Sequence, residues 1–205
     1  EYLDNPTLRK TFKFTNEINS IIKSNPEILA YSPRIIADGL IGNEQSSFGA
    51  AIMGVDPDLE KNVSTVYKKV NSGQFISNRN KYGIVVGEVL LENLKAKIGN
   101  EVVMLASGYD GSMGNLKFKI IGTVKMGQQE FDAMAVFMTL DAAKELLSMG
   151  NRVSTIALNL KSSSEVLNTK EKLNKELSRY SLKTRDWEEL MPEMKQMIEM
   201  DNISG

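Results

Sequence analysis

The sequence contains no histidine and no cysteine. Without histidine there is no Ser–His catalytic triad and no imidazole ligand for a metal. Without cysteine there is no thiol nucleophile, no zinc knuckle, no iron–sulfur cluster and no disulfide. Any catalysis would therefore depend on carboxylates, lysine, serine, threonine or tyrosine.

An excess of charge of one sign, long apolar runs and aromatic residues are also missing or scarce. The chain carries 25 Lys and Arg against 26 Asp and Glu, a formal net charge of −1, which excludes a general electrostatic attraction to nucleic acid. No stretch approaches the roughly 18 consecutive apolar residues that span a bilayer, and no signal peptide opens the sequence. With aromatic residues at 7% and a single tryptophan, the core must be aliphatic.

What is present is the composition of a globular protein. The 205 residues are 41% apolar and 25% charged, enough for one domain or two small ones. The absence of cysteine fits either a reducing cytosol or an exported protein that is stabilised by its core alone. The chain starts at Glu1 without a methionine and stops at Gly205, and we expect it to be a fragment of a longer protein.

Short strands and amphipathic helices alternate along the chain. In residues 116–120 apolar side chains alternate with lysines, which predicts a strand with one buried face. Residues 87–97 place Leu90 and Leu94 on one face of a helix, and Gly99 stands where a left-handed C-cap belongs. Together the patterns predict strands at residues 12–14, 32–42, 47–55, 84–86, 101–106, 116–124, 133–139, 154–160 and 181–186, and helices at 16–23, 60–73, 87–97, 140–148, after the Ser162–Glu165 capping box and from Trp187 onward.

This order of elements predicts an α+β fold with two lobes. Removing residues 63–150 leaves the order βαββαβ, the split βαβ plan, in residues 1–62 plus 151–187. Residues 63–150 would form a second, mixed and mainly β lobe that is inserted between the two halves. Residues 188–205 would form an exit helix. A single α+β sheet is the alternative arrangement.

Two segments resemble ligand sites but lack essential parts. Asp56, Asp58 and Glu60 are spaced like part of a calcium loop, without the glycine and the distal glutamate that such a loop requires, so a turn with solvated acids is the better interpretation. The glycine-rich residues 107–115 join two strands and do not lead into a helix, so a phosphate cradle is disfavoured. Because loops often carry partner contacts, we take Tyr109, Asp110 and Met113 as partner-contact candidates. We assign no catalytic, cofactor-binding or metal-ligating residue.

The end of the chain carries methionines at helical spacing, at Met191, Met194, Met197 and Met200. Such a stripe is typical of a helix that packs on the core. The alternative is a stalk helix that leaves the domain and enters a membrane or a partner.

Five short motifs, in order and at compatible spacing over residues 30–200, resemble those of a known family. The family is the periplasmic (extracytoplasmic) core domain of ABC transporter permeases of the MacB-type and lipoprotein-release (Lol-type), FtsX-like class. The motifs are G-V-D-P at residues 54–57 followed by Glu60 and Val63-Ser64; I-V-V-G-E at 84–88 with K-I-G-N-E-V at 97–102; F-K-I-I-G at 118–122 followed by Gly127, Glu130 and Asp132; the helix at 140–147; and W-E-E-L-M-P at 187–192.

The resemblance implies a non-catalytic domain on the outer side of the cytoplasmic (inner) membrane. It would consist of a porter-like βαββαβ lobe interrupted by a second lobe, with a stalk helix toward a membrane span. The permease would work as a homo- or heterodimer with ABC ATPase subunits, and the domain would transmit ATP-driven motion to substrate or partner. Expected partners are a lipoprotein carrier or an adaptor, with no nucleic acid and no cofactor. Membrane helices are expected directly before Glu1 and soon after Gly205 in the parent chain.

Within that family, residues 54–57 and the exit from Trp187 favour the lipoprotein-release branch. The segment at 107–115, which is short and has no arginine, matches the position where one permease of that branch carries a projecting hairpin that docks a lipoprotein carrier. MacB-type export of a peptide, drug or glycolipid is the alternative. A soluble carboxylate-based enzyme or sensor, with a site around Asp56 or Asp132, is the alternative from another class.

Overall fold

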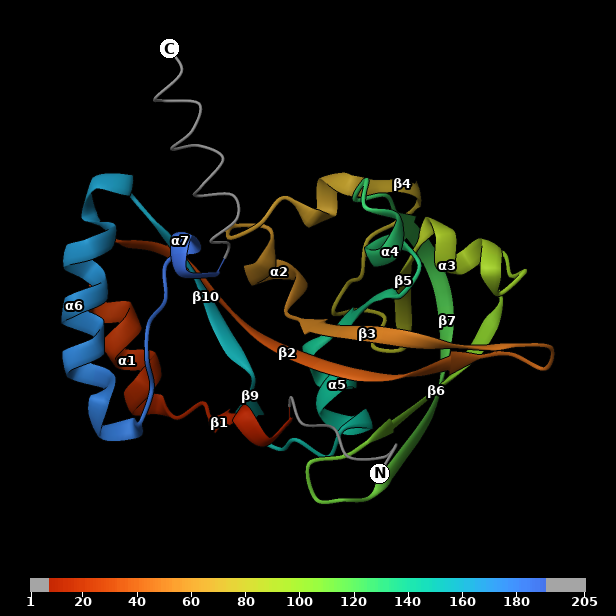
Figure 1. Cartoon of the computed structure of the whole chain (residues 1–205), viewed down its shortest axis with the longest axis horizontal. Helices are drawn as coiled ribbons and strands as arrows, with labels where there is room; N and C mark the ends of the chain where they lie inside the picture. The colour runs from red at the N-terminus through yellow and green to blue at the C-terminus, as the bar shows by residue number, and fades with distance from the viewer. Residues whose placement is uncertain (1–7, 191–205) are drawn as a thin grey trace, which may run out of the picture. The chain divides into compact units, whose positions relative to one another are not determined.

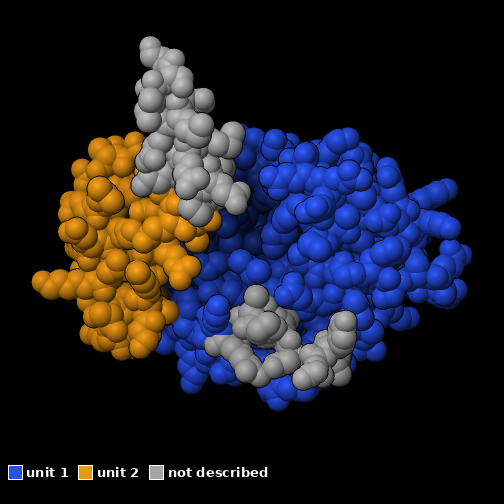
Figure 2. Space-filling view, viewed as in Figure 1, with its two compact units in different colours: residues 1–15, 30–159 blue, residues 16–29, 160–205 orange. Residues whose placement is uncertain are grey.

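The computed structural model describes residues 8–190, and the chain divides into two compact units, coloured separately in Figure 2. The larger unit comprises Glu1–Thr15 and Ala30–Asn159, and the smaller comprises Asn16–Leu29 and Leu160–Gly205. Each unit is therefore assembled from segments that are distant in the sequence.

Most of the described strands belong to one mixed β-sheet (Figure 1). Its eight strands are bonded in the order β10–β2–β3–β8–β5–β7–β4, with β6 paired to β2 and β7, while β1 and β9 form a separate two-stranded sheet. The strands are β1 (Phe12–Lys13), β2 (Ile28–Gly42), β3 (Ser47–Val55), β4 (Val70–Gly73), β5 (Gly83–Gly87), β6 (Glu101–Ser107), β7 (Met113–Val124), β8 (Ala135–Thr139), β9 (Arg152–Val153) and β10 (Thr155–Leu160).

Short helices connect these strands. The α-helices are α1 (Asn16–Ser24), α2 (Pro57–Glu60), α3 (Glu88–Asn93), α4 (Gln129–Asp132), α5 (Leu140–Leu146), α6 (Val166–Leu177) and α7 (Trp187–Leu190). The 3-10 helices are η1 (Leu8–Lys10), η2 (Val66–Lys69), η3 (Ser163–Glu165) and η4 (Ser178–Tyr180). The predicted α+β class is confirmed: the sheet contains parallel pairs, β3 with β8 and β5 with β7, among antiparallel ones.

The main core lies on the side of the sheet that α3 and α5 contact. A Cβ built on Gly54 of β3 would lie 2.3 Å from the Cβ of Ala143, so α5 packs directly against the strand where neither residue carries a larger side chain. The fully buried members of this core are aliphatic apart from Phe118, as the scarcity of aromatic residues predicts, and include Ile35, Ile52, Ile84, Leu90, Leu94, Ile120, Met138 and Leu146.

A second cluster of buried apolar residues explains the most apolar stretches of the sequence. It contains Val85, Phe137, Val55, Val66, Ile76, Ile121, Val124 and Ala135. Every residue of β5 and of β8 is buried. A strand covered on both faces has no polar face to alternate, which accounts for the continuous apolar run at residues 84–86.

Two predicted elements are wrong. The helix at residues 60–73 is replaced by α2, η2 and β4, because Val70 and the residues after it pair with β7 and Gly73 takes a φ of +73°. The strand at residues 181–186 is also absent from the described chain. Ser181 turns the chain with a φ of +57°, and the following residues bond to α6 instead of to a strand.

Strands from both predicted lobes meet in the large sheet. Met53 of β3 pairs with Phe137 of β8, and Leu40 of β2 pairs with Leu105 of β6. The division into residues 1–62 plus 151–187 and residues 63–150 stays a prediction about which parts of the chain act as one body. Of the predicted exit helix, the structure describes α7, and residues 191–205 with their methionines lie outside the described residues.

Candidate functional site

The loop between β6 and β7 carries Tyr109 and Asp110, two of the residues predicted to contact a partner, and the third, Met113, begins β7. The loop is a closed turn, in which the amide of Gly108 donates to the carbonyl of Ser112 (2.8 Å) and the amide of Gly111 donates to the carbonyl of Gly108 (3.0 Å). The amide of Tyr109 donates to the carbonyl of Leu147, just after α5 (2.7 Å). The loop is therefore shaped by its own backbone and tied to the end of α5.

Asp110 has a structural partner in the same loop. Its carboxylate accepts hydrogen bonds from the hydroxyl (2.5 Å) and the amide (3.0 Å) of Ser112, and that hydroxyl lies 3.2 Å from the hydroxyl of Ser148. The side-chain hydrogen bond from Ser112, followed by the backbone one, holds the pKa of Asp110 below its ordinary value. Asp110 thus keeps its charge while it fixes the turn.

Tyr109 contacts Arg152, which in turn bonds Thr11 in the first segment of the larger unit. The guanidinium of Arg152 lies 4.2 Å from the centre of the Tyr109 ring, a cation–π distance. Arg152 also donates from Nε to the hydroxyl of Thr11 (3.0 Å) and from Nη2 to the carbonyl of the same residue. Tyr109 is still 45% exposed, although its ring is held by Arg152.

Met113 lies at the end of a sheet face that sequence reasoning missed. The strand registers place Ile36, Asp38 and Leu40 of β2 on the same face as residues 49, 51 and 53 of β3, 103 and 105 of β6, and 113, 115 and 117 of β7. Ile36 is 43% exposed, and Leu40 and Met113 are each 49% exposed. We call this surface the open face.

The signal for the open face was present in the sequence. Residues 35–36 and 40–41 are adjacent apolar pairs within one strand. Because successive side chains of a strand point to opposite faces, such pairs put apolar side chains on both. One member of each pair, Ile35 or Ile41, is buried in the main core, and the other, Ile36 or Leu40, is exposed.

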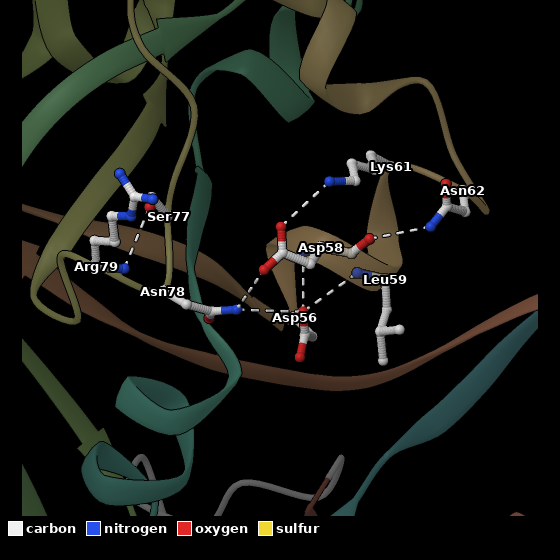
Figure 3. Close-up of polar contacts among 8 residues, drawn as sticks. All are labelled: Asp56, Asp58, Leu59, Lys61, Asn62, Ser77, Asn78 and Arg79. Carbon is white, nitrogen blue, oxygen red and sulfur yellow. Dashed lines mark hydrogen bonds and ion pairs between the residues drawn. The ribbon is translucent and has the colours of Figure 1, made fainter.

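Of the three acids at residues 56–60, Asp56 and Asp58 both bond the side-chain amide of Asn78, and Glu60 is bonded elsewhere. Asp56 caps α2, accepting from the amides of Asp58 (2.9 Å) and Leu59 (3.2 Å), and the side-chain amide of Asn78 bonds Asp58 (3.2 Å), as Figure 3 shows. Glu60 is 2% exposed and bonds Arg34 instead. Among residues 8–190 no group of three or more acidic side chains is placed to hold a metal ion.

Asp132, the other acid considered for a carboxylate site, is buried. Its two oxygens accept from the backbone amides of Met126 (2.9 Å) and Gly127 (3.1 Å). These bonds close the loop between β7 and α4. Both Asp56 and Asp132 thus serve as acceptors for backbone amides, which gives each a structural role.

The comparison with protein families decides the identity of the domain. The model of the MacB-like periplasmic core domain matches residues 5–176. The chain belongs to this family. The resemblance to the core domain of ABC transporter permeases is thereby confirmed.

A Lol-type permease protein resembles this domain over most of its length. The chain is 26% identical over 194 residues to the lipoprotein-releasing system transmembrane protein LolC of Neisseria meningitidis serogroup B (strain ATCC BAA-335 / MC58). That match covers 91% of this chain but 45% of LolC, so the chain spans less than half the length of this curated relative.

Two solved structures share the fold of this MacB-like domain. The extracellular domain of the noncanonic ABC-type transporter YknZ from Gram-positive bacteria matches with a TM-score of 0.63 at 14% identity, over 85% of this chain and 87% of that one. The periplasmic region of MacB from Actinobacillus actinomycetemcomitans matches with a TM-score of 0.63 at 16% identity, over 92% of this chain and 83% of that one.

The described part of this MacB-like domain exposes several large apolar residues. None of the helices within residues 8–190 is long and apolar enough to cross a membrane. The exposed apolar residues of the larger unit include Tyr109, Met113 and the open-face residues Ile36 and Leu40; Tyr67, Tyr82, Ile98 and Met134 are exposed elsewhere on this unit. Such groups bind through shape and apolar area.

Proposed function

We propose that this domain belongs to an ABC permease of the inner membrane and transmits the ATP-driven motion of membrane helices to a substrate or partner, with lipoprotein release as the favoured process. The observation that carries the proposal is the similarity to LolC, which extends over 194 residues. The permease would act as a homo- or heterodimer with separate ATPase subunits, and this domain would carry out no catalysis.

Tyr109 and Met113 are the residues through which we expect this domain to contact a periplasmic partner. Tyr109 is held by Arg152 and the end of α5, so binding would not have to order it. Met113 continues into the open face, where Leu40 is equally exposed. Asp110 contributes by fixing the turn that presents both side chains.

MacB-type export of a peptide, drug or glycolipid is the second candidate, and the shape of the β6–β7 loop favours it. Only residues 108–112 separate the two strands, and the loop bonds back to α5 through Leu147. Within the lipoprotein-release branch, the permease that docks a carrier is expected to project a longer hairpin. A short, tied loop fits an adaptor that covers a broad surface.

A binding experiment separates the two processes. The full-length permease, reconstituted with its ATPase subunits, would be tested for capture of a purified periplasmic lipoprotein carrier and of a purified periplasmic adaptor. Carrier capture that Met113→Ser weakens supports lipoprotein release, and Met134→Ser is the matched control, because Met134 is also exposed (45%) but lies before β8. Adaptor capture without carrier capture would favour export, and capture of neither would contradict the proposed partner contact.

A further inference from the structure

In the smaller unit, the residues after η4 return along α6. The amide of Leu182 donates to the carbonyl of Leu177 (3.4 Å), the amide of Thr184 donates to the side-chain oxygen of Asn174 (2.6 Å), and the ammonium of Lys170 bonds the carboxylate of Asp186 (2.9 Å). The return segment, residues 182–186, is therefore bonded to α6 at three successive positions along the helix.

The spacing of the bonded residues on α6 matches the spacing of their partners in the return segment. On α6 the three partners are separated by three and four residues, which places them on one face of the helix. In the return segment the bonded residues are every second one, Leu182, Thr184 and Asp186. The helical stretch from 170 to 177 rises roughly 10 Å, a length that four further residues can span, and the three bonds hold the return segment alongside it.

The return segment ends in a capped helical turn. The carboxylate of Asp186 accepts from the amide of Glu189 (2.9 Å), and the carboxylate of Glu189 accepts from the amide of Asp186 (3.3 Å). The amide of Leu190 donates to the carbonyl of Asp186 (3.2 Å). This reciprocal pair is a capping box with aspartate at the N-cap, and it starts α7.

Lys170 holds both acids of that capping box. Its ammonium lies 2.9 Å from a carboxylate oxygen of Asp186 and 2.7 Å from one of Glu189. The side chains of Lys170 and Asp186 are largely covered, at 19% and 10% exposure. The hydrogen bond from Lys170 is the largest cause that holds the pKa of both acids below their ordinary values, so both stay charged around neutral pH.

We propose that Lys170 is a positioning residue that fastens the first turn of α7 to α6, so that a displacement of α7 carries α6 with it. The proposal rests on the proposed function, in which motion enters the domain through the chain that leaves it at α7. A hinge there would let α7 swing without moving α6. Two ion pairs from one lysine to both members of the cap remove that freedom.

Hydrogen exchange tests the fastening in the 205-residue chain. In Lys170→Met we expect the amides of Glu189 and Leu190 to exchange at least about threefold faster than in the wild type, because a charge-assisted tie of the capping box is lost. Lys170→Arg should restore slow exchange. Lys172→Met is the matched control, an exposed lysine of the same helix. Equal exchange in Lys170→Met and Lys172→Met would overturn the fastening.

Transport tests whether the fastening matters for coupling. In the full-length permease with its ATPase, Lys170→Met should lower the amount of substrate released per ATP hydrolysed by about threefold or more, with rescue by Lys170→Arg. Release per ATP equal to that of Lys172→Met would overturn the coupling role. Failure of the proposed function itself would look different, because wild-type permease would then release substrate equally with and without ATP.

Discussion

The guanidinium of Arg34 on β2 donates two hydrogen bonds to the carboxylate of Glu60 at the end of α2, from Nε (3.0 Å) and from Nη2 (2.6 Å). Glu60 is 2% exposed. Burial alone raises the pKa of Glu60, but the hydrogen bonds from Arg34 and Ser64 and the charge of Arg34 outweigh it and hold this pKa below its ordinary value. The pair joins β2 to the helical turn that follows β3.

Removing Arg34 should therefore destabilise the domain. Arg34→Met leaves a buried carboxylate without its partner, and we expect a loss of about 2–3 kcal/mol in the free energy of unfolding, measured by urea denaturation at pH 7. The double variant Arg34→Met/Glu60→Leu removes both charges and should regain most of that loss. A single variant within about 0.5 kcal/mol of the wild type would contradict this account of the pair.

The same pair predicts a pH dependence. Because the pKa of Glu60 is lower in the folded protein than its ordinary value of 4.5, the pair contributes stability above that pH and loses it as pH falls through the lowered folded value. The stability difference between the wild type and Arg34→Met/Glu60→Leu should thus shift in favour of the double variant below pH 4.5. Urea denaturation at pH 7, 5, 4 and 3 measures this difference, and a constant difference would show that Glu60 does not titrate differently on folding.

Gly87 lies at the junction of β5 and α3, inside the motif I-V-V-G-E. A Cβ there would lie 2.1 Å from the backbone oxygen and 2.7 Å from the carbonyl carbon of Asp132, and backbone cannot yield as a flexible side chain would. We expect Gly87→Ala to lower the free energy of unfolding by about 3 kcal/mol or more. Gly49→Ala is the control, since nothing lies within 4 Å of its Cβ position, and should change stability by less than about 0.5 kcal/mol. If Gly87→Ala and Gly49→Ala unfolded at the same temperature, the close contact at Gly87 would be refuted.

Asp132 should stabilise the domain through the hydrogen bonds that its carboxylate accepts from backbone amides. Asp132→Ala removes the acceptor of two amides, those of Met126 and Gly127, and we expect a loss of about 1–3 kcal/mol in thermal or urea denaturation. Asp132→Asn keeps one acceptor oxygen in place and should lose less. If the asparagine variant proved as unstable as the alanine variant, the charge of the carboxylate would matter more than the two hydrogen bonds.

Local patterns were sufficient where burial alone selects the element. The lysine alternation at residues 116–120 lies in β7 and the apolar run at 84–86 lies in β5. Gly99 has the positive φ expected of it (+99°), but the predicted C-cap is wrong, because α3 ends at Asn93 and Lys95 is the residue just after the helix with a left-handed φ (+51°). Each of these signals reports on the side-chain period or on one backbone angle. Reading the side-chain period or a single backbone angle requires no knowledge of the rest of the chain.

Pairings between distant residues were beyond the same reasoning. Arg34 and Glu60 are 26 residues apart, and Arg152 reaches Thr11 across 141. Residues 181–186 are predicted to form a strand but bond to α6, where Asn174 and Lys170 pair with the amide of Thr184 and the carboxylate of Asp186. Tyr109 and Asp110 could be placed on a loop from sequence, whereas the position of Met113 at the start of β7 and the open face beside it depend on strand register.

The central claim is that ATP hydrolysis elsewhere in the permease moves this domain. Because the sequence has no cysteine, Lys172→Cys gives a unique labelling site within it, on an exposed position of α6. The measurement is energy transfer from a dye at this position to acceptor dyes on lipid headgroups, in vesicles that contain the full-length permease and its ATPase. The account predicts that ATP changes the transfer efficiency and that an ATPase unable to bind ATP leaves it unchanged. Equal efficiency with and without ATP, while ATP is being hydrolysed, would contradict it.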